Sequence, residues 1–285
     1  GDEEDGGDEE DEDYDRDTEA LEWEEDLVEQ IEYALCRMYE THGEAFIPYL
    51  DQVLPWFQSR LQDTDPSQQR LAINLFDDLL ELGVTGEGGV PLPVQALVSR
   101  FGASLLVSSR SDDPDLRQAA IYGLGLCAQH GGPAFSPHVE EAVGTLSFTV
   151  SAQNARSEDN EASTDNAISA LGKIAQFQGI EPAKASHIWA MWLAYLPMKA
   201  DVPEALLVHK QLCQLVEANN PDILGPNHSN LARILTVFSQ ILETETCDDK
   251  ISRDIRTILH QAQAGLGDAV EVACRGLPPA QVLLC

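Results

Sequence analysis

Residues 119–125 read Ala-Ala-Ile-Tyr-Gly-Leu-Gly, and residues 166–172 read Asn-Ala-Ile-Ser-Ala-Leu-Gly. The two strings align when the sequence is shifted on itself by 47 residues, and the same shift brings Gln-Arg-Leu-Ala-Ile at 69–73 onto Leu-Arg-Gln-Ala-Ala at 116–120. Internal repetition at a period of roughly 20–50 residues is typical of stacked repeat architectures. A compact helical bundle would not require an internal repeat of this kind. The sequence therefore predicts an array of repeated units.

Each unit is expected to be a helix, a turn and a second helix. Apolar residues recur at helical spacing from Leu21 onward, and Asp-Pro at 65–66 and 113–114 marks the start of a second helix, because proline suits the first helical turn. This pattern resembles the HEAT repeat and predicts an all-α, right-handed superhelical α-solenoid of about five to six hairpins. The expected second helices lie near 20–42, 65–83, 112–131, 160–178, 201–219 and 248–264, and the first helices near 44–62, 91–109, 136–153, 183–196 and 227–243.

Negative charge is concentrated in the N-terminal segment, and the rest of the chain is acidic as well. The formal net charge is −32, of which residues 1–32 carry −18. Residues 1–19 contain 13 Asp or Glu and are expected to be disordered; the solenoid is expected to span 20–265, with a tail or capping segment at 266–285. A field of this sign repels nucleic acid and anionic membranes and attracts basic proteins. We expect a cationic protein partner, and neither direct nucleic-acid binding nor membrane insertion.

Motifs for catalysis, metals and cofactors are missing from the sequence. The six cysteines form no Cys-x-x-Cys pair, the seven histidines form no His-Glu-x-x-His motif, and Gly123-Leu124-Gly125 falls inside a helical repeat and not after a strand. The first residues are not a signal peptide, and no apolar run reaches the roughly 18 residues that span a bilayer. The sequence favours a binding protein in a reducing compartment, with no enzymatic activity, cofactor or metal.

Several strings go beyond a general HEAT pattern. Residues 117–125 followed by Ala-Gln-His-Gly-Gly at 128–132, residues 166–174, Trp-Ala-Met-Trp-Leu-Ala-Tyr-Leu-Pro at 189–197 and Leu-Gly-Pro-Asn at 224–227 are similar to the C-terminal repeats of the karyopherin-β family. An acidic run just before the first helix is similar as well. The resemblance covers nearly the whole chain, although the tail after Leu266 fits poorly.

The resemblance implies a role and a set of partners. Karyopherin-β proteins are import receptors that carry basic cargo through the nuclear pore under the control of the GTPase Ran. The implied cargo comprises core histones, with or without a histone chaperone, and ribosomal proteins; Phe-Gly nucleoporins are the implied pore partners. The family binds Ran mainly through N-terminal repeats that this chain lacks, so we expect Ran contact through that missing part. The implied localisation is shuttling between cytoplasm and nucleus.

The second helices also predict a binding surface. Positions 47 residues apart are equivalent in three successive repeats. We take the sets 73/120/167, 77/124/171 and 80/127/174 to face the core. The opposite face of the second helices then carries the sets 71/118/165, 75/122/169 and 78/125/172. Carboxylates with amide and phenol groups on neighbouring helices can hold a lysine ammonium while a ring flanks its stem. The predicted cargo-binding residues on this concave face are Asp78, Glu81, Tyr122, Asp165, Asn166, Ser169 and Glu204. The alternative is a set of solvated polar positions, or for Glu204 a complement to a helix N-terminus.

Other features leave alternatives open. Residues 1–19 either compete for basic cargo or act as a solubilising linker. Trp189, Trp192 and Tyr195 form a stripe better suited to packing than to Phe-Gly binding. An acidic histone chaperone and a HEAT scaffold subunit of a larger assembly are the rival functions.

Overall fold

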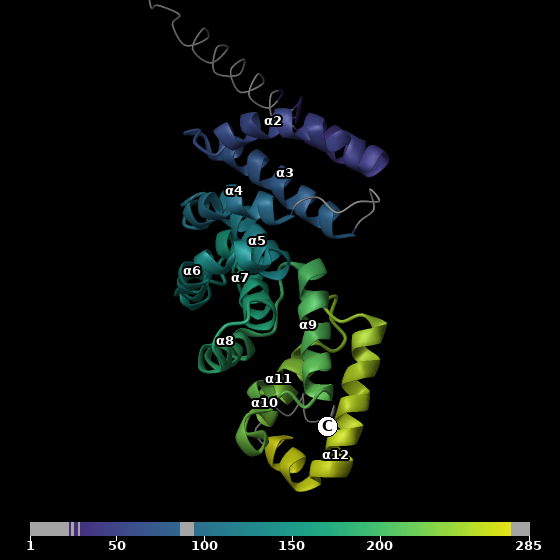
Figure 1. Cartoon of the computed structure of the whole chain (residues 1–285). Helices are drawn as coiled ribbons and strands as arrows, with labels where there is room; N and C mark the ends of the chain where they lie inside the picture. The colour runs from purple at the N-terminus through teal and green to yellow at the C-terminus, as the bar shows by residue number, and fades with distance from the viewer. Residues whose placement is uncertain (1–22, 24–25, 28, 86–93, 275–285) are drawn as a thin grey trace, which may run out of the picture. The chain divides into compact units, whose positions relative to one another are not determined.

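The computed structural model describes residues 23, 26–27, 29–85 and 94–274, and the regular structure in these ranges is entirely helical. Figure 1 shows the helices following one another in chain order as consecutive hairpins. The second helices are residues 29–42, α3 (Pro66–Thr85), α5 (Pro114–His130), α7 (Glu158–Phe177), α9 (Val202–Glu217) and α12 (Asp249–Cys274). The first helices are α2 (Ile47–Arg60), α4 (Val94–Ser108), α6 (Val139–Ser151), α8 (Pro182–Tyr195) and α11 (Leu231–Ile241). Short turns of helix are η1 (Gly43–Phe46), η2 (Gly132–Ala134), η3 (Ser136–His138), α10 (Pro221–Leu224) and η4 (Pro226–His228).

The predicted order of hairpins is confirmed within the described residues, but not every predicted boundary coincides with a helix end. Helix α12 continues to Cys274, so it crosses the boundary that we expected at 265. The predicted disordered segment 1–19 and the last residues of the tail, 275–285, lie outside the described residues.

The chain divides into two compact units, residues 1–104 and 105–285, and each has its own core. In the first unit, Leu54 and Phe57 of α2 are buried, as are Ile73 and Phe76 of α3. The ring of Phe76 stacks on that of Phe101 at 4.7 Å between centroids. These aromatic and aliphatic side chains give the first unit an apolar interior of its own.

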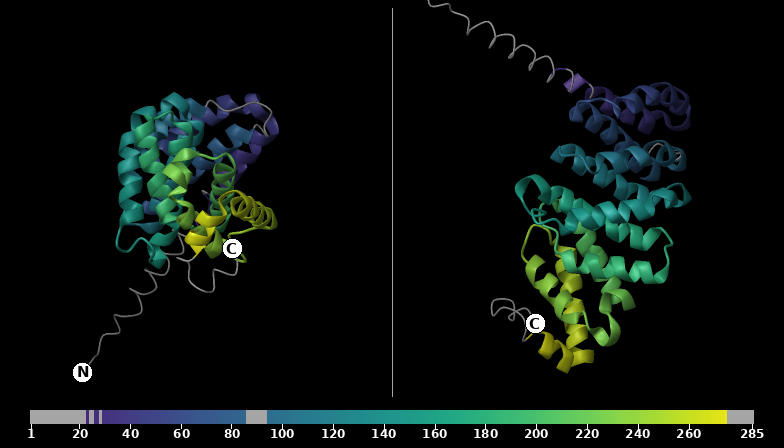
Figure 2. Two further views of the ribbon diagram at one scale, coloured as in Figure 1. Left: turned by 90° about the horizontal axis from the view of Figure 1, so that it is seen from below. Right: turned by 90° about the vertical axis from the view of Figure 1, so that its left-hand side faces the viewer.

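The core of the second unit is built mainly on α5 and α7, which pack against each other. The predicted inward positions are confirmed, because the following six residues have no exposed surface: Ala120, Leu124, Cys127, Ala167, Leu171 and Ile174. Helix α7 also packs against α6, α8 and α9, and the turned views of Figure 2 show the same succession of helices. The second helices of this unit are therefore covered on several sides.

The Asp-Pro turns start helices by capping them. The side chain of Asp113 accepts a hydrogen bond from the backbone N–H of Leu116 at 2.8 Å, and that of Asp65 accepts one from Ser67 at 2.9 Å. Asp201 caps α9 in the same way through Glu204 at 3.0 Å. A capping carboxylate satisfies N–H groups that have no partner in the first helical turn. The repeat signature therefore fixes where each second helix begins.

Arginines join one repeat to the next. Arg117 at the start of α5 donates to the Asn160 side chain of α7 at 2.7 Å and to the Ser111 carbonyl at 2.7 Å. Arg233 of α11 donates to the carbonyls of Leu193 at 3.1 Å and Ala194 at 2.7 Å, at the end of α8. Carbonyls at a helix C-terminus have no intrahelical partner, so a guanidinium there satisfies them.

The aromatic stripe on α8 packs in the interior. Trp189 and Trp192 are buried and meet edge to face at 5.2 Å between ring centroids. Trp192 lies against Gly172 of α7, where an added Cβ would come within 2.7 Å of the indole nitrogen. The packing interpretation of these two tryptophans is confirmed. Only a glycine at 172 allows the two helices to approach this closely.

Candidate functional site

The first unit carries an acidic groove between residues 29–42 and α3. Its cavity of about 320 Å³ is lined by Tyr33, Cys36, Arg37, Glu40, Asp78, Glu81 and Leu82. Of the predicted cargo-binding residues, Asp78 and Glu81 lie in this groove, and both are exposed. We refer to this cavity, together with the adjoining buried Glu32, as the acidic groove.

Glu32 is the residue of the acidic groove that the sequence did not single out. Its side chain is buried and shares a hydrogen bond with Asp78. Burial, and then the charge of Asp78, raise the pKa of Glu32 to about 8. Although Asp78 as a whole is exposed, desolvation of its carboxyl group beside Glu32 also raises the pKa of Asp78. The two carboxyl groups therefore share a proton at neutral pH, because two carboxylates this close to each other cannot both ionise at low cost.

A thiol and a cation complete the acidic groove. The Cys36 sulfur lies 4.0 Å from Asp78 Oδ2, and burial, followed by the charge of Asp78, raises the pKa of this thiol to about 12, so it stays uncharged. Arg37 pairs with Glu40 and lies 5.6 Å from the centre of the Tyr33 ring. A carboxylate on one side and an aromatic face on the other is an arrangement suited to a cation. The groove therefore has the chemistry of a cation-binding site.

Four predicted site residues in the second unit are buried and not open to solvent. Asp165, Asn166, Ser169 and Glu204 are each no more than 5 % exposed. The expectation that this face of α7 is open is therefore wrong, because α5, α6, α8 and α9 all pack against the helix. The same applies to Leu71 and Leu75 of α3, which are also buried.

Asp165 has partners for both of its oxygens. Its Oδ1 accepts from the Arg156 guanidinium at 2.5 Å, and its Oδ2 accepts from the backbone N–H groups of Lys199 and Ala200, each at 2.7 Å. These bonds fix the connection between α8 and α9. Asp165 therefore holds the fold together in this structure. The neighbouring Asn166 Oδ1 has no hydrogen-bond partner among the described residues.

The remaining predicted residues meet around a lysine of the same chain. The Lys173 ammonium lies 2.5 Å from Glu204 Oε1 and 5.7 Å from the centre of the Tyr122 ring. The Ser169 hydroxyl donates to the same Glu204 oxygen. We call Tyr122, Ser169 and Glu204 the ammonium site. The sequence predicted one common face for Tyr122 and Ser169 and left the role of Glu204 open, and it gave no signal that Lys173 would pair with Glu204.

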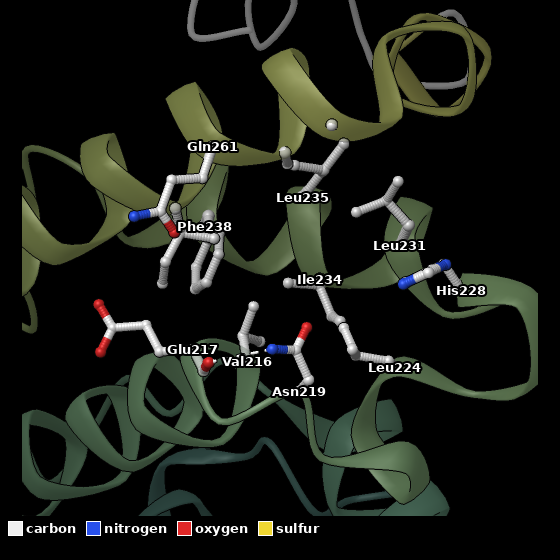
Figure 3. A pocket seen from close by; sticks show the side chains of 13 residues that line it. Val216, Glu217, Asn219, Leu224, His228, Leu231, Ile234, Leu235, Phe238 and Gln261 are labelled. Atoms are coloured by element: carbon white, nitrogen blue, oxygen red, sulfur yellow. Dashed lines mark hydrogen bonds between the residues drawn. The ribbon is translucent and has the colours of Figure 1, made fainter.

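Two apolar cavities of the second unit have a different chemistry. One, of about 710 Å³, lies between the outer helices α6 and α8 and includes Val139, Val143, Ile180 and Ile188. The other, of about 290 Å³, lies between α9, α11 and α12. Figure 3 shows Val216, Ile234 and Phe238 pointing into the latter, with Glu217 and Gln261 also lining it. Sequence patterns did not single out either cavity, because apolar residues on helices look like core residues.

The described ranges contain neither a bilayer-spanning helix nor a cluster of metal-ligating side chains. No helix there has the length and hydropathy needed to cross a bilayer. The same ranges hold no group of three or more His, Cys, Asp or Glu arranged to bind a metal ion.

The geometry defines a helical-repeat scaffold with an acidic groove in its first unit and an internally paired lysine in its second. Comparison with solved structures agrees with this class of fold. The chain superposes on Kap121p bound to RanGTP with a TM-score of 0.68 and 19 % identity, covering 95 % of this chain and 24 % of that one. For Kap121p bound to the SUMO protease Ulp1p the TM-score is 0.66 and the identity 22 %, with 91 % of this chain and 23 % of that chain covered. The HEAT-type solenoid fold is thereby confirmed.

Sequence comparison identifies the family resemblance. A family model described as Importin repeat 6 matches residues 2–63. A probable importin-5 homolog of Dictyostelium discoideum is 30 % identical over 254 residues, covering 85 % of this chain and 22 % of the relative. Importin subunit beta-3 of Saccharomyces cerevisiae is 25 % identical over 243 residues, covering 85 % and 21 %.

Importin-4 of Mus musculus is 26 % identical over 197 residues, covering 69 % of this chain and 17 % of the relative. The chain thus spans about a fifth of the length of the curated relatives it matches. The predicted resemblance to the karyopherin-β, or importin, family is confirmed. Both an importin-4 and a probable importin-5 homolog are among these relatives.

Proposed function

We propose that this chain is part of a nuclear import receptor and binds lysine-rich segments of basic cargo proteins, such as core histones and ribosomal proteins, in its acidic groove. The receptor acts as a scaffold and not as a catalyst, and it shuttles between cytoplasm and nucleus. Ran is contacted through repeats outside this chain. The relatives support transport, since they are importins, and one solved neighbour is a complex with RanGTP.

The observation that carries the proposal is the deficit of positive charge in the acidic groove. Glu32, Asp78, Glu81 and Glu40 converge there, whereas Arg37 supplies a single cation to the cavity lining. A cargo ammonium that entered between Asp78 and Glu81 would replace the proton shared by Glu32 and Asp78. Hydrogen bonds to charged groups contribute about 1.5–3 kcal/mol each, so one lysine can add substantially to affinity.

A charge-reversal experiment tests the proposal. A lysine-rich peptide is titrated calorimetrically into the chain and into its Asp78→Lys/Glu81→Lys variant. We expect affinity to fall by about tenfold or more, because two attractive carboxylates become repulsive cations. Equal affinity for the two proteins would reject the acidic groove as the cargo site.

A matched control separates the acidic groove from net charge. Glu44→Lys/Asp51→Lys makes the same change in total charge at exposed positions of the same unit that do not line the groove. This control is expected to reduce affinity by less than about threefold at physiological salt, because screening weakens charges beyond roughly 8 Å. An equal loss in both variants would mean that charge acts only at long range.

The predicted residues of the second unit enter this proposal in a different way. Asp165 and Asn166 are buried, and both oxygens of Asp165 are paired, so we assign these two residues to the stability of the second unit. Tyr122, Ser169 and Glu204 form a cation site that is already filled. The direct contacts to cargo are therefore assigned to Asp78 and Glu81.

A second binding function is favoured by the larger apolar cavity. The cavity between α6 and α8 offers aliphatic side chains between two outer helices, and a solved Kap121p structure is a complex with Nup53p. We assign this cavity to apolar side chains of Phe-Gly nucleoporins. Substituting Val143→Asp should abolish retention on immobilised Phe-Gly repeats and leave lysine-peptide affinity unchanged; retention of the variant would contradict the assignment.

The rival functions differ in a measurable way. An acidic histone chaperone would bind histones and would not bind pore repeats, and a scaffold subunit would copurify with a fixed catalytic partner. Binding of both lysine-rich peptide and Phe-Gly repeats to this chain would favour the transport receptor over both alternatives.

A further inference from the structure

The ammonium site of the second unit has the composition of a lysine-binding pocket. The Lys173 ammonium contacts the Glu204 carboxylate and lies over the Tyr122 ring, and the Ser169 hydroxyl donates to the same Glu204 oxygen. The side chains of Lys173 and Glu204 are 14 % and 6 % exposed, so the contact is largely sheltered from water, while Lys173 keeps a small exposed surface. Sheltered ion pairs are screened less than exposed ones. The pocket therefore holds an ammonium ion by geometry as well as by charge.

The surroundings of the pocket carry more negative than positive charge. Burial, and then the charges of the nearby Glu204 and Asp165, raise the pKa of the Asp201 carboxyl. Arg156 pairs with Asp165, and Lys173 pairs with Glu204. Among the residues that the structure describes, Asp201 forms no ion pair, and its side chain caps α9. Three carboxylates thus face two cations, which favours an additional positive charge.

Lys173 is suited to leave this position. It extends from α7 toward α9, and its stem passes Gly125, where an added Cβ would lie 3.5 Å from Lys173 Cδ. Lysine is a flexible point charge that is strongly hydrated when free, in contrast to the planar guanidinium of arginine. A lysine from another molecule has the same shape and charge, so it can exchange with Lys173 at little cost in contacts.

We propose that Tyr122, Ser169 and Glu204 form a second lysine-binding site and that Lys173 is its internal occupant in the unbound protein. The use of this site by cargo rests on the proposed function above. A cargo lysine then competes with Lys173 for the ammonium position. Lys173 sets a threshold that only a segment with several lysines overcomes.

Chemical rescue tests the site without any cargo. In Lys173→Ala of the full chain, n-butylammonium can occupy the vacated stem and ammonium positions. We expect 50 mM n-butylammonium to raise the melting temperature of this variant by about 2 °C or more relative to equal concentrations of n-butanol and tetramethylammonium. The wild-type protein and the Lys173→Ala/Glu204→Ala variant should show no such difference. If n-butylammonium fails to rescue Lys173→Ala selectively, the proposal is wrong.

Peptide affinity gives the second readout. Lys173→Ala is expected to bind a lysine-rich peptide about tenfold more tightly than wild type, because the internal competitor is gone. If the alanine variant fails to fold, Lys173→Met replaces it, because methionine keeps most of the side-chain length without the charge. We expect the peptide affinity of Lys173→Met to exceed that of wild type by about threefold. Unchanged affinity in a folded variant contradicts the proposal.

The proposed cargo groove and the proposed ammonium site can be rejected independently of each other. If reversal of Asp78 and Glu81 leaves peptide affinity unchanged while n-butylammonium rescues Lys173→Ala, the proposed cargo groove is wrong and the ammonium site stands. If reversal weakens binding but rescue and affinity gain are both absent, the acidic groove stands and this inference is wrong.

Discussion

At the scale of single residues, Glu32 links stability to pH. Its folded-state pKa of about 8 lies above the ordinary value of 4.5, so the folded protein keeps a proton that the unfolded chain releases. The stabilising contribution is complete below pH 4.5 and is lost as pH rises toward 8. Deprotonation of this buried carboxyl beside Asp78 therefore weakens the first unit in mildly alkaline solution.

Glu32→Gln should remove this loss. The amide keeps the shape of the protonated acid and carries no charge at any pH. We expect the variant to be more stable than wild type by about 1 kcal/mol at pH 8 and equal to it at pH 5. Hydrogen exchange of residues 29–85, measured at both pH values, checks this. A variant that is less stable at pH 8 would show that Glu32 is ionised and paired.

The ionisation of Glu32 should also make cargo affinity depend on pH. Between pH 6.5 and 8.5 the groove gains negative charge as Glu32 ionises, whereas a lysine ammonium, with an ordinary pKa of about 10.4, stays charged. Lysine-peptide affinity should rise severalfold over this range in wild type and much less in Glu32→Gln. A histidine-free peptide in isothermal titration gives the comparison. A fall in affinity with rising pH would refute the charge assignment of the groove.

His209 gives the second unit the opposite response to pH. Its ring is fully buried, Nε2 accepts from the Met198 N–H at 3.2 Å, and Nδ1 lies 2.8 Å from the Thr246 carbonyl, to which it donates. Burial lowers the pKa of this imidazole below its ordinary 6.5. The unfolded chain therefore takes up a proton more readily, and stability falls as pH drops below 6.5.

Substitution of His209→Phe should abolish this acid sensitivity between pH 5 and 6.5 and lower stability at pH 7.5 by about 1–3 kcal/mol, because two backbone groups lose their partner. Urea unfolding at several pH values provides the measurement. His187→Phe, at an exposed position of α8, is the control and should leave the pH dependence unchanged. Persistent acid sensitivity in His209→Phe would assign the effect to another group.

At the scale of helices, the approach of α7 to α8 depends on one glycine. Gly172→Ala would place a methyl group 2.7 Å from the Trp192 indole nitrogen, and neither buried helix can move freely. We expect destabilisation of about 1–3 kcal/mol, the usual cost of overpacking. Gly144→Ala, where an added Cβ meets nothing within 4 Å, should be neutral or stabilising by about 0.5–1 kcal/mol. Thermal unfolding of both variants measures these changes in stability. Equal changes in Gly172→Ala and Gly144→Ala would contradict the packing argument.

The sequence predicted helices well because each one carries several independent signals. Capping aspartates such as Asp113 and Asp201 mark helix starts, and the inward positions of α5 and α7 follow the helical period. The binding face was harder to predict, because periodicity distinguishes two faces of a helix and cannot show how many neighbours cover them. Helix α7 has four such neighbours, so Asp165 and Ser169 became buried. The occupancy of the ammonium site by Lys173 depends on tertiary geometry that no local pattern contains.

At the scale of the whole molecule, charge governs encounter more than affinity. With a net charge of −32, the chain attracts cationic peptides over distances comparable to the Debye length. We expect the association rate of a lysine-rich peptide to fall about tenfold between 50 and 500 mM salt, with a smaller change in the dissociation rate. Stopped-flow measurements with and without residues 1–19 separate the contribution of the acidic segment. An association rate independent of salt would rule out steering.

The central claim is that cargo lysines contact the acidic groove. Carbodiimide coupling of a bound lysine-rich peptide joins its amines directly to the carboxylates that they touch, and mass spectrometry locates the bonds. The account predicts that, within residues 20–274, coupling concentrates on Asp78 and Glu81. Coupling confined to exposed carboxylates away from the groove, such as Glu44, Glu140 and Glu181, would contradict it.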